Sequence, residues 1–212
     1  MTVTGTITTQ DLIADALRKI GVVAEDEPMT ADQAANGLRA WNRLLKSWQN
    51  RGYNLWTVAT LSIPLTTAAS YTMSPVRPIR ILNARLVRDG IETPMIQMTR
   101  QEYDALPVKT STGLPTQFYY DKQREAALFY VWPVLVAASG ETVNVTYERE
   151  AEDQTLAGVP DIPGEWWEAA VYGLAARLAD DYGQNVPNVI ARAEEELRLA
   201  MADDREESVF FT

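Results

Sequence analysis

The clearest pattern along the chain is an apolar stripe at helical spacing between residues 30 and 50. It opens with Thr30 and Gln33, whose side chains can satisfy the first backbone donors of a helix as a capping box. Apolar positions then recur every three or four residues, at Ala34, Leu38, Trp41, Leu45 and Trp48. The opposite face is polar and carries Arg39, Arg43, Lys46 and Asn50. We predict a helix of about twenty residues, ended by Gly52, around which the rest of the fold is organised.

The same spacing recurs in three other segments, 8–20, 161–182 and 185–202. The first begins at Thr8 or Thr9 and is linked to the next helix closely enough to form a helical hairpin. The helix predicted over 161–182 buries Trp167, Val171, Leu174 and Leu178. It also has a smooth side, which another helix can approach closely, at Ala169, Gly173 and Ala176. The last helix is expected to face inward with Ile190, Ala193, Leu197 and Met201.

Between residues 57 and 150 the period of the pattern changes to two, with β-branched residues, tyrosines and prolines that disfavour a helix. The strongest hairpin signal is Asp89-Gly90, which lies between two alternating segments. The predicted strands cover 61–65, 70–73, 79–88, 91–98, 117–120, 127–132 and 142–149. A short helix is predicted over 99–106. No strand is followed by the helix that a parallel βαβ unit requires, so we expect an antiparallel sheet.

Two helices, a β region and two more helices predict an α+β protein. Its helical bundle is built from the N- and C-terminal helices, and the antiparallel β region is inserted between them. The predicted boundaries are 1–56 for the N-terminal helical hairpin, 57–150 for the β domain, 151–204 for the C-terminal helices and 205–212 for a tail. A hydrophobic fraction of 46% in 212 residues is enough for a sizeable core.

The net charge of −10 is unevenly distributed along the chain. Residues 1–150 carry 15 acidic and 15 basic side chains, whereas residues 151–212 carry 14 acidic and 4 basic ones. The whole excess of negative charge therefore lies in the last part of the chain. Such a surface repels nucleic-acid phosphate, which argues against a DNA-gripping module. A solvated, solubilising face is the simplest interpretation.

Composition excludes several kinds of chemistry. The chain has no cysteine and no histidine, so disulfides, thiolate chemistry, imidazole catalysis and ordinary structural zinc sites are absent. It has no glycine-rich phosphate loop either. The beginning of the sequence is polar and no run of about eighteen apolar residues occurs, so we expect neither export nor a membrane span. We expect no cofactor and no metal.

Paired carboxylates are the remaining catalytic candidates, as acid and base in the cleavage of a glycoside. The pairs are Glu165 with Glu168 and Asp180 with Asp181. The first pair lies in the first turn of a predicted helix, where acidic residues offset the helix dipole without any chemistry. The two aspartates are adjacent, so they point in different directions on a helix. Neither pair identifies an enzyme by residue type and spacing, and we predict no catalytic residue.

Contacts between identical subunits are a second hypothesis for the charged residues. The predicted basic face carries Arg39, Arg43 and Lys46, and the acidic last third includes Glu194 and Glu195. These opposite signs allow head-to-tail contacts between subunits, and contacts of this kind close into rings. A solvated helix face remains the alternative for each residue taken separately.

The end of the sequence is apolar after a charged run. Val209, Phe210 and Phe211 follow two glutamates and have no obvious place in a single-chain core. The segment is either disordered or inserts into a partner as an apolar anchor, and the residues alone leave both interpretations open.

A series of short phrases occurs in a characteristic order along the chain. The phrases are Asp11-Leu12-Ile13 with Ile20-Gly21-Val22; Thr30-Ala31-Asp32-Gln33-Ala34 with Trp41-Asn42 and Ser47-Trp48; Arg77-Pro78 with Arg88-Asp89-Gly90; and Gly113-Leu114-Pro115 with Phe118-Tyr119-Tyr120-Asp121. In this order they resemble the P22-like tail accessory factors, also called packaged-DNA stabilisation or head-to-tail adaptor proteins, of short-tailed bacteriophages. The resemblance covers about Thr9 to Met201.

The resemblance implies a structural protein of the virion and no enzyme. It implies a homo-oligomeric ring of subunits, matching the twelvefold symmetry of the portal, that docks at the portal vertex of the filled capsid. The ring would close the DNA channel after packaging and provide the platform for the tail. The implied partners are the portal protein, the tail nozzle or another tail protein, further copies of the chain, and genomic DNA passing without specific binding. The chain would be made in the host cytoplasm.

The resemblance also suggests roles for surface residues. A negative channel wall lets DNA slide without sticking, and the candidates for it are Asp180, Asp181, Asp203 and Asp204. The apolar residues 209–211 would grip the portal and order on binding. Two alternatives stay open: a cell-wall hydrolase carried on the same virion protein and acting through a carboxylate pair, and a generic oligomerising scaffold unrelated to phage.

Overall fold

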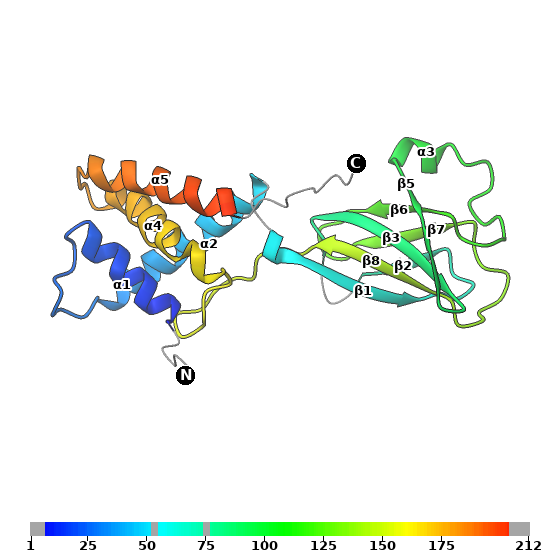
Figure 1. The fold of residues 1–212 in the computed structure, drawn as a ribbon, viewed down its shortest axis with the longest axis horizontal. Helices are drawn as coiled ribbons and strands as arrows, with labels where there is room; N and C mark the ends of the chain where they lie inside the picture. The colour runs from blue at the N-terminus through cyan, green and yellow to red at the C-terminus, as the bar shows by residue number, and fades with distance from the viewer. Residues whose placement is uncertain (1–6, 52–54, 74–76, 204–212) are drawn as a thin grey trace, which may run out of the picture. The chain divides into compact units, whose positions relative to one another are not determined.

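The computed structural model describes residues 7–51, 55–73 and 77–203. The chain divides into a helical unit, Met1–Trp56 with Ala151–Thr212, and a β unit, Thr57–Glu150 (Figure 1). The helical unit is assembled from both ends of the chain, and the β unit is inserted between them. The predicted α+β class, a bundle of N- and C-terminal helices with an inserted β region, is therefore confirmed.

Local capping fixes where the first helices of the helical unit begin. The α-helices described in this unit are α1 (Thr9–Lys19), α2 (Ala31–Asn50), α4 (Trp167–Asp181) and α5 (Pro187–Asp203). Capping boxes start α1 and α2, because the Thr8 and Thr30 hydroxyls each accept a hydrogen bond from the backbone N–H three residues later at 3.2 Å. Gly21 follows α1 with a φ of 72°, which favours glycine. Gly52, the predicted end of the second helix, lies outside the described residues.

Tryptophans join the helices of this unit into one core. The Trp48 ring centroid lies 6.1 Å from that of Trp41 and 5.4 Å from that of Trp166. Trp166 is fully buried at the end of a 3₁₀ turn, η2 (Gly164–Trp166), which precedes α4. The predicted core residue Trp167, at the start of α4, is half-buried and packs against the same core. The fully buried ring of the two is that of Trp166, which the sequence prediction did not include.

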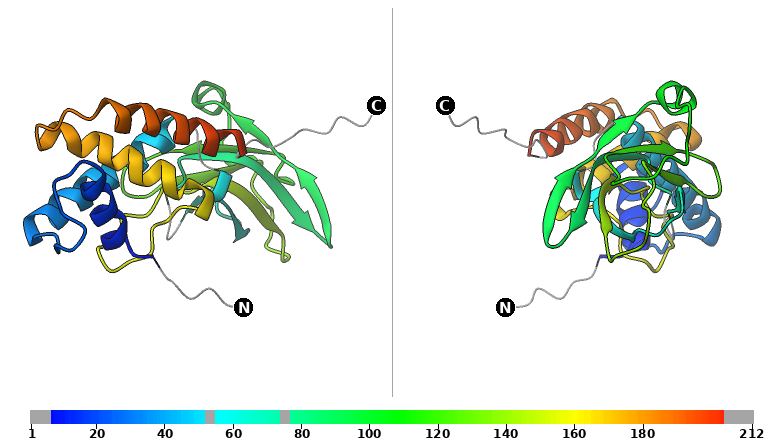
Figure 2. Two further views of the ribbon diagram at one scale, coloured as in Figure 1. Left: turned by 60° about the vertical axis from the view of Figure 1, so that its left-hand side comes forward. Right: turned by 90° about the vertical axis from the view of Figure 1, so that its right-hand side faces the viewer.

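Helix α4 is the centre of the packing in the helical unit. Helices α1, α2 and α5 all pack against it, and α4 and α5 lie side by side as an antiparallel pair (Figure 2). Val171, Leu174 and Leu178 are buried on α4, as predicted. No helix in the described segments is both long and apolar enough to cross a membrane.

Helix α5 is covered on one side only. Ala200 is its fully buried apolar residue, while Ala193, Leu197 and Met201 are half-buried. Ile190, which the sequence predicted to face inward, has 45% of its surface exposed. The prediction was wrong at this position because the apolar stripe of α5 is wider than the surface with which α4 covers it.

The β unit contains two four-stranded sheets. The first has the order β1-β8-β3-β4, with strands β1 (Val58–Pro64), β3 (Arg80–Arg88), β4 (Ile91–Pro94) and β8 (Thr142–Glu148). The second has the order β2-β7-β6-β5, with strands β2 (Ser70–Thr72), β5 (Ile96–Met98), β6 (Gln117–Asp121) and β7 (Leu128–Trp132). The buried side chains of both sheets form one core, in which the rings of Phe118 and Phe129 stack with centroids 5.0 Å apart.

One predicted strand of the β region needs correction. The hairpin turn at Asp89-Gly90 is present, with φ values of 52° and 78°, but the predicted return strand 91–98 divides in two. Strand β4 pairs with β3 up to Pro94, the backbone N–H of Met95 still donates a hydrogen bond to the carbonyl oxygen of Ala84 at 2.9 Å, and β5 then joins the other sheet. Segments 61–65 and 70–73 likewise belong to different sheets.

The pair β5–β6 is parallel, against the expectation of an antiparallel sheet. Parallel neighbours need a long crossover connection, and the chain between the two strands supplies one. It contains the predicted short helix, α3 (Arg100–Asp104), which Thr99 caps. The sequence pattern predicts this helix but does not show that it connects two parallel strands. The other pairs between the described strands are antiparallel.

Candidate functional site

A groove of about 220 Å³ lies on the helical unit between α2 and α5. We call it the α2–α5 groove. Its apolar lining comes from three helices and includes Leu44, Trp48, Gly173, Ile190, Ala193 and Leu197. Because α2 and α5 both pack on α4, the α4 residues form the floor of the groove.

Gly173 allows α2 to pack closely on the floor of this groove. A Cβ added to Gly173 would lie 3.2 Å from a ring carbon of Trp48 and 3.3 Å from a methyl carbon of Leu44. These distances leave little space for any larger residue. The predicted smooth side of this helix is thus where another helix approaches, and the approaching helix is α2.

Arginines surround the apolar lining. Arg51, at the C-terminal cap of α2, and Arg177 of α4 line the groove, and Arg43 is near enough for its charge to act on Arg177. Partial burial, together with the positive charges of Arg51 and Arg43, lowers the pKa of Arg177 from its ordinary value. The guanidinium groups of the three make no hydrogen bond or ion pair with a residue that the structure describes. The acidic residue in the lining is Glu194.

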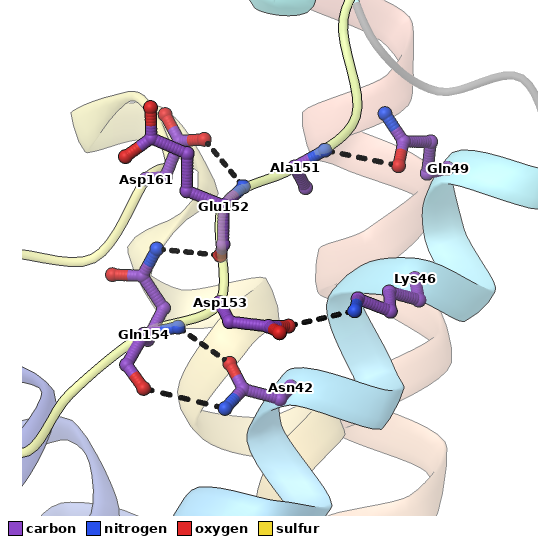
Figure 3. Close-up of polar contacts among 8 residues, drawn as sticks. All are labelled: Asn42, Lys46, Gln49, Ala151, Glu152, Asp153, Gln154 and Asp161. Carbon is purple, nitrogen blue, oxygen red and sulfur yellow. Dashed lines mark hydrogen bonds and ion pairs between the residues drawn. The ribbon is translucent and has the colours of Figure 1, made fainter. Parts of the chain in front are cut away.

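The three cations of the predicted basic face, Arg39, Arg43 and Lys46, have different contacts in the structure. Lys46 forms an ion pair with Asp153, with the ammonium nitrogen 2.7 Å from a carboxylate oxygen (Figure 3). Arg39 donates a hydrogen bond to the side chain of Asn36, one turn earlier on α2. Of the three predicted subunit-interface cations, Arg43 is the one that belongs to the arginine cluster at the groove.

The neighbouring face of α2 binds the chain where it returns from the β unit. Asn42 accepts a hydrogen bond from the backbone N–H of Gln154 at 2.8 Å and donates one to its carbonyl oxygen at 3.3 Å. Gln49 accepts a hydrogen bond from the backbone N–H of Ala151 at 3.1 Å. With Lys46 between them, these side chains fix residues 151–154 against the helix (Figure 3). This polar face is therefore structural.

The predicted acidic interface residues lie on α5. Glu194 is exposed and lines the groove, and Glu195 is exposed beside it. Arg192 contacts Glu195 at 3.0 Å and Glu196 at 2.7 Å, as expected for neighbours one turn apart on a helix. Glu195 is therefore partly neutralised within its own helix, whereas Glu194 is beside the arginine cluster.

The remaining predicted site residues are at the ends of helices or outside the described chain. Asp180 and Asp181 are exposed at the C-terminal end of α4. Asp203 ends α5, and Asp204 lies outside the described residues, as does the tail segment 209–211. Within the described chain, Asp180 and Asp181 therefore lie at the opposite end of the α4–α5 pair from Asp203.

The predicted carboxylate pair is placed at the start of α4. Glu165 lies in η2 and Glu168 in the first turn of α4, and both are exposed. Glu168 lines an open hollow of about 720 Å³, together with Asp15 and Arg18, which pair with each other at 3.0 Å. Glu165 is not part of this lining. Among the described residues, no three acidic side chains are grouped closely enough to hold a metal ion.

The sequence of both units matches the model of one known protein family. The model of the SU10 adaptor protein family matches residues 7–209, which include both units. The chain belongs to the SU10 adaptor protein family. No curated protein matches the sequence. The resemblance to head-to-tail adaptors is confirmed at the level of this family, and the narrower likeness to the P22-like factors stays a prediction.

The sequence analysis missed two of the three arginines of the cluster. Arg51 is the residue directly after α2, about two turns beyond Arg43, and Arg177 lies one turn beyond Gly173 on the smooth side of α4. The sequence shows the position of each arginine relative to its own helix. It does not show that α2 packs on α4, and this contact is what brings the arginines of the two helices together.

Proposed function

We propose that this SU10-family protein is a head-to-tail adaptor of a bacteriophage. In this role its subunits form a ring on the portal, close the DNA channel after packaging and provide the attachment platform for the tail. The observation that carries the proposal is the family match, which runs through both units from residue 7 to residue 209. The function is structural, and it requires assembly rather than a substrate.

The distribution of charge supports self-association. The side chains of Arg43, Arg51 and Arg177 have no acidic partner among the described residues, and Glu195 is exposed on α5 outside the lining of the groove. A surface with unpaired cations and a second surface with exposed anions favour heterologous contacts between copies, and such contacts close into a ring. Twelve copies would match a twelvefold portal. Arg39 and Lys46 contribute less to this contact, because both already bind within their own chain.

Passage of DNA through the ring is compatible with the excess of negative charge. The net charge of −10 opposes binding of phosphate, so DNA would slide past an acidic wall without being held. We propose Asp180, Asp181, Asp203 and Asp204 for this wall. The protein would act at the portal vertex of the virion, with no membrane partner.

Portal attachment is the role we propose for the tail. Val209, Phe210 and Phe211 are the apolar residues of a segment that otherwise contains charged residues. Aromatic side chains that fill a pocket on a partner contribute much of the binding energy in protein interfaces. Replacing both phenylalanines by serine should abolish portal attachment and leave the circular dichroism spectrum unchanged. Attachment at wild-type strength would exclude the tail from this role.

Native mass spectrometry tests the proposal directly. The purified chain is measured alone and after mixing with the portal protein encoded in the same genome. We expect a stoichiometric complex with the portal, with or without a ring of the chain alone. A chain that stays monomeric and ignores the portal would contradict the adaptor function, and an unrelated portal is the matched negative control.

A further inference from the structure

We propose that the α2–α5 groove is a docking site for the chain's own C-terminal segment, residues 206–211, in the free subunit. The inference concerns an intramolecular contact and does not need a portal or a ring. Three observations carry it: the uncovered apolar lining of the groove, the place where α5 ends, and the charges on the two sides of the contact.

The groove leaves apolar surface of α5 uncovered by the described chain. Ile190 is 45% exposed, and Ala193 and Leu197 are half-buried although all three belong to the apolar stripe of the helix. They face Trp48 and Leu44 of α2 across the α4 floor. An apolar segment laid between the two helices would remove this surface from water, which is favourable in proportion to the area covered.

The length of the segment fits a contact within one subunit. The described part of α5 ends at Asp203, ten residues beyond Ala193, which corresponds to about 15 Å along the helix. Five residues of extended chain, from Asp203 to Ser208, span about 17 Å. Because the reversal after α5 takes up part of this length, the returning chain brings Ser208 to a level between Leu197 and Ala193. The apolar residues Val209 to Phe211 then lie beside Ile190.

The charges of the segment complement those of the groove. Glu206 and Glu207 precede the apolar residues, and the groove presents Arg51 and Arg177, with Arg43 close by. Glu194 opposes the contact, but the arginines outnumber it. Nucleic acid would compete poorly for the same cations, because the chain as a whole carries a net charge of −10. A short acidic and aromatic peptide segment is therefore the favoured occupant.

Disulfide trapping in the full-length protein tests this contact. The chain has no cysteine, so a pair of introduced cysteines reports one contact only. The test variant combines Ala193→Cys with Ser208→Cys, which leaves Val209, Phe210 and Phe211 unchanged. The matched control combines Glu195→Cys with Ser208→Cys, because residue 195 is on the same helix but turned away from the groove. Oxidation at low protein concentration is followed on non-reducing gels.

We expect the intramolecular disulfide to form about tenfold faster in the test variant than in the control, because docking raises the effective concentration of Ser208→Cys at residue 193. In the test variant, the further substitutions Arg51→Glu and Arg177→Glu should remove this difference in rate. Adding Glu206→Lys and Glu207→Lys to them should restore the difference, because the two sides of the contact then again carry opposite charges. Arg39→Glu, on the same helix outside the groove lining, should leave it unchanged. Circular dichroism establishes that each variant is folded.

Two results would overturn the inference. Equal rates in the test and control variants would mean that the segment has no preferred site on α5. Disulfide-linked dimers in place of monomers would mean that the groove takes the tail of a second copy. Because no portal is present in the experiment, either result leaves the adaptor proposal to be decided by the mass spectrometry described above.

Discussion

Gly37 of α2 lies so close to Ile13 of α1 that a Cβ added to the glycine would overlap Cγ2 of the isoleucine. Ile13 is fully buried, so it has no free space into which to move. We therefore expect Gly37→Ala to destabilise the helical unit by about 1–3 kcal/mol, the usual cost of overpacking a core, despite the better helix propensity of alanine. Urea unfolding followed by tryptophan fluorescence measures this, because five of the six tryptophans are in the helical unit.

Gly164→Ala is the matched control for this prediction. A Cβ at Gly164 meets nothing within 4 Å, and the residue does not need a positive φ. Its substitution should change the free energy of unfolding by less than about 0.5 kcal/mol. Similar effects for both substitutions would contradict the tight packing of α1 on α2.

The returning segment 151–154 gives a prediction about relative magnitudes. Asn42→Ala leaves the backbone N–H and carbonyl of Gln154 without their partner, which should cost about 1–3 kcal/mol. Lys46→Ala removes an ion pair whose side chains are 43% and 70% exposed, which should cost about 0–1 kcal/mol. The same unfolding experiment compares the two variants. A larger loss for Lys46→Ala would mean that the charge, and not the amide of Asn42, holds this segment.

The β unit should lose stability at alkaline pH through Tyr120. Burial is the main cause that raises the pKa of Tyr120 to about 12, and the Tyr120 hydroxyl donates a hydrogen bond to the carbonyl oxygen of Pro78. An unfolded tyrosine has a pKa of about 10. Between these two values the unfolded chain releases the proton and the folded chain keeps it, so the free energy of unfolding falls as pH rises.

Tyr120→Phe separates this effect from other titrations. We expect the variant to be less stable by about 1 kcal/mol near neutral pH, because the hydrogen bond is lost. Its stability should then decline less steeply than that of the wild type between about pH 10 and pH 12. Calorimetric scans across this range provide the measurement, and parallel pH profiles for the two proteins would refute the assignment. Burial also raises the pKa values of Tyr103 and Tyr119, so some slope should remain.

The cell-wall hydrolase alternative predicts an activity that we do not expect. Glu165 and Glu168 are exposed, and the hollow beside Glu168 does not include Glu165. Purified protein should therefore not clear a peptidoglycan suspension, and Glu165→Gln with Glu168→Gln should behave like the wild type in portal binding. Clearing that disappears in the double variant would establish an enzyme and revive the carboxylate pair.

Sequence patterns predicted the features of this fold that depend on neighbouring residues. The cap of the first helix, predicted at Thr8 or Thr9 and found at Thr8, the capping box at Thr30 and the turn at Asp89-Gly90 involve residues within one turn of each other, so the local sequence determines them. The periodicity of two also located the β region correctly. These signals, taken in order along the chain, were enough for the fold class.

The features that the sequence did not predict depend on contacts between distant segments. Strand β5 looked like the continuation of β4, because alternation of side chains does not show to which sheet a strand belongs. Arg51 and Arg177 have separate, ordinary positions on two helices, and they form a cluster only because α2 packs on Gly173. The candidate groove is a product of that packing, and no local pattern could have indicated it.

The β unit begins and ends at neighbouring residues. The backbone N–H of Arg149 donates a hydrogen bond to the carbonyl oxygen of Thr57 at 2.8 Å, and the strands that follow and precede them, β1 and β8, are paired from this point onward. An inserted domain whose ends meet can be lengthened, shortened or exchanged without altering the path of the host chain. In evolutionary terms, selection can remodel such an insertion while the sequence of the helical unit stays the same.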